Sequence, residues 1–156
     1  MTDTWTYCDL SALTSPAVHA GHDYWRSKGP PPRLPGRSQI DPLEMRPFLP
    51  KILLIDVMAD GGFVFRLCGG EIIDGNGRDL TGRRADEASL GASTPQFISA
   101  YRRTVETRQP LFFVGRMWWQ DRTYAEFEQA ILPLSADGLL IDKLFCIVDF
   151  EVRRQP

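Results

Sequence analysis

Two small groups of residues have the types and spacing for metal binding or for acid–base chemistry. His19 and His22 stand three residues apart, so a helix would place both imidazoles on one face, yet no third ligand lies close to them in the sequence. Tyr124, Glu126 and Glu128 alternate along one segment, and paired carboxylates can act as general acid and base. We interpret the histidines as surface residues and the alternating set as a solvated stripe. The sequence therefore predicts no metal site and no catalytic residue, and we do not expect an enzyme.

A run of three glycines within residues 75–82, here called the glycine connector, follows two apolar strand-like segments. A dinucleotide-binding loop would need a third glycine where Leu80 stands, and no Gly-Lys-Ser/Thr follows, so the run is not a phosphate loop. Glycines instead supply the left-handed backbone conformations of tight turns, and we expect a positive φ angle at Gly82. Asp79 is expected to cap local backbone amides.

A third set of side chains could wall a cavity for a hydrophobic ligand. Tyr101 would supply a hydroxyl, and Arg66 or Arg78 could hold a ligand carboxylate at the cavity mouth. Ordinary core packing is the alternative for the apolar members, and surface pairing is the alternative for the arginines. The candidate ligand-pocket residues are Phe65, Arg66, Leu67, Ile72, Ile73, Arg78, Leu80, Phe97, Tyr101, Phe113 and Trp119.

The composition narrows the partners that the chain could have. Its 18 Lys and Arg against 20 Asp and Glu give a formal net charge of −2, which provides no long-range attraction for nucleic acid. No apolar stretch approaches the roughly 18 residues that span a bilayer, so we expect no membrane partner. The three cysteines are widely separated and form no CxxC motif, so we interpret them as reduced core residues of a cytoplasmic protein.

The candidate residues depend on an expected order of elements. A helix over residues 15–27 is followed by a proline-rich stretch, so residues 1–37 should form a helical arm with a linker, and residues 38–156 the main domain. Asp41 followed by Pro42 predicts a short helix to about Phe48. The main domain should then contain a strand over 51–58, a strand over 63–68 with Phe63, Phe65 and Leu67 on one face, a short helix over 71–74, a longer helix over 95–107, and strands over 111–120, 124–134 and 139–152.

This order of elements and several motifs resemble a family of small bacterial PAS-like proteins, largely stand-alone domains from alphaproteobacteria. The motifs are Tyr24-Trp25, Arg33-Leu34-Pro35, Ile40-Asp41-Pro42, Pro47-Phe48-Leu49-Pro50, Phe65-Arg66-Leu67, Gly77-Arg78-Asp79-Leu80-Thr81-Gly82, Tyr101-Arg102-Arg103 and Leu132-Pro133-Leu134-Ser135. The resemblance covers roughly residues 24–150. It implies an α+β fold: a five-stranded antiparallel sheet with helices on one face, here with an extra N-terminal helix.

The resemblance also implies a role. PAS-like modules are sensory or regulatory, and they bind a small molecule or a partner protein in signalling. We expect this chain to act through protein contacts or as a homodimer, with the N-terminal helix and the outer sheet face as the contact surface.

Two cofactors used by PAS domains do not suit this sequence. Residues 76–82 align with the light-oxygen-voltage motif Asn-Cys-Arg-Phe-Leu-Gln-Gly, but Gly77 replaces the cysteine that forms the flavin adduct. A haem would need an axial base near the longer helix, whereas both histidines lie in the N-terminal arm. We therefore expect neither a covalent flavin adduct nor a histidine-ligated haem, and the ligand remains unidentified.

Two other functions are compatible with this pattern of elements. A small α+β enzyme or ligand carrier with a conical cavity would need a buried acid, for which Glu126, Glu128 and Asp142 are the candidates. A purely structural adaptor would have no internal pocket.

Overall fold

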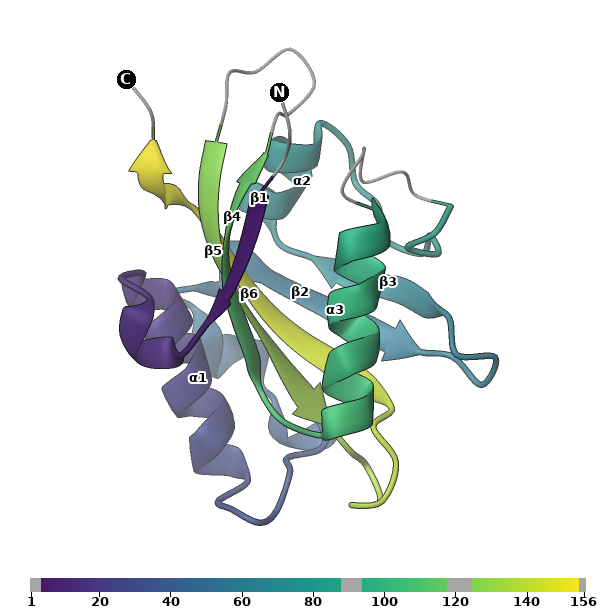
Figure 1. The fold of residues 1–156 in the computed structure, drawn as a ribbon. Helices are drawn as coiled ribbons and strands as arrows, with labels where there is room; N and C mark the ends of the chain where they lie inside the picture. The colour runs from purple at the N-terminus through teal and green to yellow at the C-terminus, as the bar shows by residue number, and fades with distance from the viewer. Residues whose placement is uncertain (1–3, 88–93, 118–124, 155–156) are drawn as a thin grey trace.

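The chain folds into an antiparallel sheet with helices on both faces (Figure 1). This computed structural model describes residues 4–87, 94–117 and 125–154. The sheet has six strands in the order β1-β4-β5-β6-β2-β3. The strands are β1 (Thr4–Cys8), β2 (Ile52–Val57), β3 (Phe63–Cys68), β4 (Leu111–Met117), β5 (Ala125–Leu134) and β6 (Lys143–Arg154), and the α-helices are α1 (Pro16–Lys28), α2 (Gly70–Asn76) and α3 (Thr94–Thr107). Short 3-10 helices span Leu10–Ala12, Arg37–Gln39, Pro42–Met45 and Leu49–Lys51.

The predicted α+β fold with an antiparallel sheet is confirmed, and the sheet gains one strand that was not predicted. Strand β1 pairs antiparallel with β4 and extends the sheet at that edge. Its Trp5 ring reaches the core, with ring centroids 4.5 Å from those of both Phe97 and Phe113. A strand as short as β1 has too few residues for its local pattern to predict pairing with a strand more than one hundred positions away.

The sheet is apolar on both faces because its strands alternate between two cores. On β6, Leu144, Cys146 and Val148 belong to the core beneath α2 and α3, whereas Phe145 and Ile147 belong to the core beneath α1. We call the side that carries α2 and α3 the inner face and the side that carries α1 the outer face. Figure 1 shows α1 and α3 on opposite sides of the strands.

Helix α1 lies close against the outer face. Ser15 caps its first turn by accepting from the Val18 amide at 3.1 Å, and Pro16 stands at its first position. The indole Nε1 of Trp25 donates to the Pro133 carbonyl at 2.9 Å. Gly21 permits the close approach, because a Cβ there would lie 2.5 Å from Cγ1 of Ile147. The outer face, predicted as part of a partner surface, is therefore covered within the chain.

The prediction that Glu126 and Glu128 form a solvated stripe is wrong. Both are buried, with exposed fractions of 5% and 0%. Glu128 accepts from the Thr14 amide at 2.5 Å, from the Thr14 hydroxyl at 2.9 Å and from the Ser15 amide at 3.1 Å. Glu126 accepts from Arg116 Nε at 2.6 Å. The residues that lead into α1 supply the donors to Glu128 that solvent would otherwise provide, and Arg116 on β4 supplies a donor to Glu126. Tyr124 lies outside the described residues.

Strand β3 also departs from the predicted alternation. Phe63 and Phe65 face the inner core, but Leu67 packs with the outer core. The pairing of β2 with β3 shifts register, so that Leu54 opposes Leu67 while Ile55 opposes Phe65, and Arg66 is the extra residue. A bulge of this kind reverses the side-chain alternation beyond it, which turns Cys68 toward the inner face.

The segment over 139–142 was predicted as the start of a strand and is part of a turn instead. Asp137 accepts from the amides of Leu139 and Leu140 at 2.8 and 3.0 Å, and the Ser135 hydroxyl donates to the Leu140 carbonyl at 2.7 Å. Arg108 also donates to the Gly138 carbonyl at 2.9 Å. These bonds fix the β5–β6 turn with both leucine side chains outward, exposed by 75% and 72%.

A Gly21→Ala variant should test the packing of α1. The added methyl would meet the buried Ile147 side chain, so we expect the free energy of unfolding to fall by about 1–3 kcal/mol. Gly70→Ala is the matched control, because a Cβ at that helical position meets nothing within 4 Å. Urea unfolding measures both, and equal stability of the two variants would contradict the described packing.

Candidate functional site

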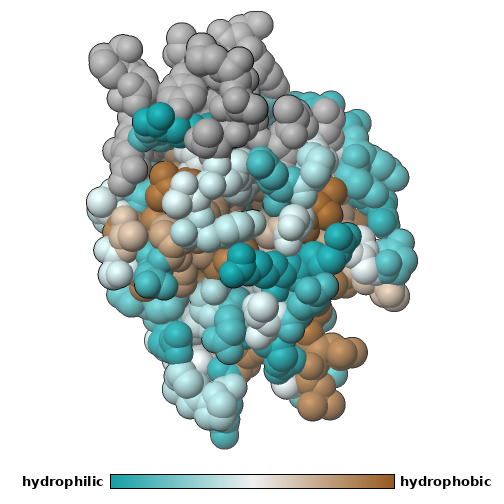
Figure 2. Space-filling model, viewed as in Figure 1, coloured by the Kyte–Doolittle hydropathy of each residue, from teal (hydrophilic) through white to brown (hydrophobic). Residues whose placement is uncertain are grey.

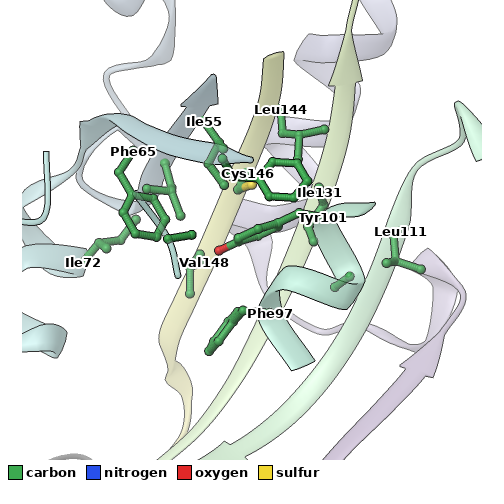
Figure 3. Close-up of a cluster of buried hydrophobic side chains, with 14 of the residues drawn as sticks. Ile55, Phe65, Ile72, Phe97, Tyr101, Leu111, Ile131, Leu144, Cys146 and Val148 are labelled. Carbon is green, nitrogen blue, oxygen red and sulfur yellow. The ribbon is translucent and has the colours of Figure 1, made fainter. Parts of the chain in front are cut away.

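A cavity of about 30 Å³ lies between the inner sheet face and helices α2 and α3. This volume has room for roughly one or two water molecules. Figure 3 shows the core around it, with Phe65 and Ile72 on one side and Phe97 and Tyr101 from α3 on another. The lining residues are Leu53, Phe65, Cys68, Ile72, Asn76, Leu80, Phe97, Tyr101, Phe127, Gln129, Val148 and Phe150.

Five residues that the sequence singled out line this cavity: Phe65, Ile72, Leu80, Phe97 and Tyr101. Phe113 belongs to the same core, where its ring packs on Trp5, but it does not line the cavity. Trp119 lies outside the described residues. The structure thus brings together the candidates from β3, α2, the glycine connector and α3.

The other four candidates lie elsewhere. Arg66 is exposed and pairs with Asp56, with 2.6 Å between Nη2 and Oδ2. Arg78 is also exposed, Ile73 is half-buried, and Leu67 packs with the outer core. Neither arginine lines the cavity, so the proposed carboxylate anchors are not positioned to hold a ligand inside it.

The most informative residue that the sequence analysis missed is Gln129. It lies on the inner face of β5 between Phe127 and Ile131, and it is 1% exposed. Neither its amide nitrogen nor its amide oxygen has a nitrogen or oxygen hydrogen-bond partner among the described residues, and its contact with the Cys146 thiol is with a weak donor and acceptor. A polar residue at an inward position of an apolar alternating strand is a signal that the sequence contains. The sequence contains no comparable signal for Cys68, because the bulge at Arg66 determines which sheet face the Cys68 side chain points to.

The remaining polar groups near the cavity are neutral. Burial raises the pKa of Tyr101 well above its ordinary value, and the nearby Cys146 and Cys68 act in the same direction. Burial also raises the pKa of both thiols, an effect that Gln129 opposes at Cys146. Leu53 on β2 lies opposite Cys68 on β3 and opposite Cys146 on β6. The two cysteine Cα atoms are therefore two strand spacings, about 9.5 Å, apart, which is too far for a disulfide.

The acids that could have supported catalysis do not reach the cavity. Glu126 and Glu128 face the outer side of β5, and Asp142 accepts from the Ala136 amide at 3.1 Å in the β5–β6 turn. No aspartate, glutamate or histidine lines the cavity in the part of the chain that is described. The enzyme alternative therefore loses its acid–base candidates.

The histidines pack against the body of the protein instead of standing free on its surface. His19 Nε2 lies 2.7 Å from the Leu13 carbonyl, and the His22 ring packs near Trp25 and Phe112. Burial, with a smaller contribution from Arg26, lowers the pKa of His22. Within residues 4–87, 94–117 and 125–154, no cluster of three or more His, Cys, Asp or Glu could hold a metal ion. Across the same ranges, no helix has the length and apolarity to cross a membrane.

Helix α2 and the glycine connector, here together called the lid, lie over the cavity. Ile72 and Leu80 are their buried side chains, and both line the cavity. The backbone turns at Gly82, whose φ of 87° confirms the predicted positive value. Asp79 accepts from the amide and hydroxyl of Thr81 at 3.0 and 2.6 Å, which confirms its predicted local role.

One salt-bridged lysine joins this lid to the sheet and, through it, to α1. Lys51 Nζ lies 2.9 Å from Glu71 on α2 and 3.3 Å from Asp149 on β6. The other oxygen of Asp149 accepts from the hydroxyl of Ser15, the N-cap of α1, at 2.6 Å. A polar chain therefore runs from the cavity lid to the start of the outer helix.

Comparisons with known proteins found one family model and a similar solved structure. A family model described as a PAS domain matches residues 13–146. A solved structure described as an RNA-binding light-oxygen-voltage receptor is similar, with a TM-score of 0.49, 16% sequence identity and a match over 96% of this chain. The match covers 38% of that receptor chain, so the present chain spans little more than a third of its length. No curated protein matched the chain.

The buried Tyr101 hydroxyl predicts a specific loss of stability in alkali. Unfolding lowers the pKa of this tyrosine to about 10, so above that pH the unfolded chain releases a proton that the folded chain keeps. Stability should therefore fall with rising pH, by up to about 1.4 kcal/mol per pH unit from this group. Urea unfolding between about pH 9.5 and pH 11.5 should show a shallower decline in Tyr101→Phe than in the unmodified protein. Equal slopes would contradict the described burial.

Proposed function

The chain belongs to the PAS domain family, and from this premise we propose that it is a sensory or regulatory module that binds a small molecule in the inner cavity. The observation that carries the proposal is the cavity itself, with its largely apolar walls and the amide of Gln129, which has no nitrogen or oxygen partner among the described residues. Pockets for small ligands combine these two features, namely an apolar lining and few polar groups.

A ligand larger than one or two waters requires the lid to move outward. The lid is α2 with the glycine connector, held by the burial of Ile72 and Leu80 and by the bridge from Lys51 to Glu71. Burying the two aliphatic side chains contributes about 3–6 kcal/mol together, whereas micromolar binding provides about 8 kcal/mol. Ligand binding can therefore offset the opening of the lid.

Lid movement would be transmitted to α1 through the polar chain from Lys51 to Asp149 and Ser15. Displacement of Glu71 removes a carboxylate that holds Lys51, and Asp149, which also holds Lys51, accepts from the helix cap. The signal would then leave through protein contact or homodimerisation. Because α1 and its flanking segments cover the outer sheet face, the contact would involve the exposed side of α1 and other exposed apolar residues.

The β5–β6 turn is the clearest such apolar surface. Figure 2 shows a hydrophobic protrusion at the lower right, where Figure 1 places this turn. Leu139 and Leu140 are exposed there on a backbone that Asp137 and Ser135 hold in place. Fixed apolar side chains lose little conformational freedom on association, which favours their use in protein contacts.

A second candidate function is a structural adaptor that binds a partner protein and no small molecule. The small size of the cavity, about 30 Å³, favours it. The two functions differ in one respect that can be measured, because only the sensory module requires the inner cavity to accept a ligand.

A Cys68→Leu variant should separate these functions. Leucine adds volume to the cavity without adding charge, so we expect fragments that bind the unmodified protein in ligand-observed NMR to lose binding. Cys8→Leu is the matched control, because Cys8 lies on β1 away from the cavity and packs with the outer core. Fragments that bind the two variants equally well, or an absence of fragments that bind, would favour the adaptor.

Light scattering coupled to size exclusion should test self-association. We expect the unmodified protein to elute as a dimer, and the double variant Leu139→Ser/Leu140→Ser to shift toward monomer because it removes two exposed apolar contacts. Leu43→Ser is the control, since Leu43 is 69% exposed elsewhere on the surface. A monomer at every concentration would contradict the homodimer, and an unchanged dimer in the double variant would contradict the turn as its contact.

A further inference from the structure

Gln129 cannot satisfy its amide with its neighbours in the sheet. Its cross-strand partners are Phe113 on β4 and Val148 on β6, and its neighbours on the same face of β5 are Phe127 and Ile131. The Cys146 thiol lies near enough to interact, but a thiol is a weak hydrogen-bond donor and acceptor. Apart from this weak contact, both atoms of the buried carboxamide lack a partner among the described residues, and native proteins rarely retain a buried amide in that state.

The walls around this amide restrict the charge of any partner that enters. Among the described residues, no lysine, arginine, aspartate, glutamate or histidine lines the cavity. A carboxylate or ammonium group placed there would lose its hydration without gaining a countercharge. Several of the lining side chains are aromatic, including Phe65, Phe97 and Phe127, and such surfaces pack well against a planar ring.

We propose that Gln129 is the polar recognition group of the cavity and that the ligand is an uncharged, mainly apolar molecule with a hydrogen-bond donor and acceptor side by side. A primary carboxamide or a lactam on a small ring has this chemistry, since each can pair with both atoms of the glutamine amide at once. This inference rests on the proposed function and specifies the class of ligand for the same cavity.

Tyr101 supplies a second polar group of the same neutral kind. Figure 3 shows its hydroxyl pointing into the core on the side where Phe65, Ile72 and Val148 lie, and all three of these residues line the cavity. Burial raises the pKa of this hydroxyl, so it keeps its proton at neutral pH and can both donate and accept. The polar groups of the cavity therefore favour a hydrogen-bonding ligand without a net charge.

Three probes of similar shape distinguish the ligand classes: benzamide, benzoate and toluene. Each is titrated into the full chain and followed by protein chemical shifts. We expect benzamide to bind about tenfold or more tightly than the other two, because only benzamide pairs with both amide atoms without carrying charge.

Gln129→Met preserves side-chain length but removes the amide, so benzamide affinity should fall to that of toluene. Gln96→Met, on an exposed position of α3, should leave all three affinities unchanged.

The outcomes separate this inference from the proposed function. Toluene or benzoate binding as tightly as benzamide, or a preference for benzamide that survives Gln129→Met, would overturn the ligand class and leave the ligand site in place. No binding by any probe would overturn both. A thermal melt of Gln129→Met completes the test: we expect a melting temperature no lower than that of the unmodified protein, because the substitution removes no hydrogen bond to a nitrogen or oxygen atom of the described residues. A large decrease together with lost toluene binding would assign Gln129 a structural role and overturn the inference.

Discussion

The burial of both sheet faces is the constraint on which the rest of this structure depends. Residues 126–135 of the central strand β5 and the turn that follows are all buried, so no side of this strand faces solvent. Each face therefore needs a cover, α1 on one side and α2 with α3 on the other. A central strand buried on both faces leaves every polar side chain on it dependent on a protein or ligand partner.

Two adjacent polar residues of β5, Glu128 and Gln129, differ in whether the protein supplies their hydrogen-bond partners. Glu128, on the outer face, accepts hydrogen bonds from three donor groups of Thr14 and Ser15, and its carboxyl group lies where the positive end of the α1 dipole stabilises a carboxylate. Gln129, on the inner face, has no such bonds among the described residues. The outer face is thus a completed interface that positions α1, whereas the inner face keeps one unsatisfied amide beside a cavity. This asymmetry identifies the inner face as the candidate ligand site.

Local patterns in the sequence predicted most of the elements, and long-range contacts account for the errors. Strand β3 was predicted with its observed bounds, because aromatic alternation and the Asp60-Gly61-Gly62 turn are local signals. The burial of Glu128 could not be predicted, because its donors lie more than one hundred residues away. The bulge at Arg66 reversed the directions of Leu67 and Cys68, which no propensity encodes. The cavity was therefore predicted on its α2 and α3 sides and at Phe65 on β3, but its lining residues on β5 and β6, Gln129 among them, were missed.

Native mass spectrometry of the full chain, purified without denaturation, tests the central claim most directly. We predict that part of the protein carries a non-covalent small molecule that is released on denaturation. Its exact mass should identify it as a compound without charged groups, and the Gln129→Met variant should lose it. A spectrum containing only the mass of the unmodified chain and its oligomers, even when the protein is taken directly from cell extract, would contradict the assignment of the inner cavity as a ligand site.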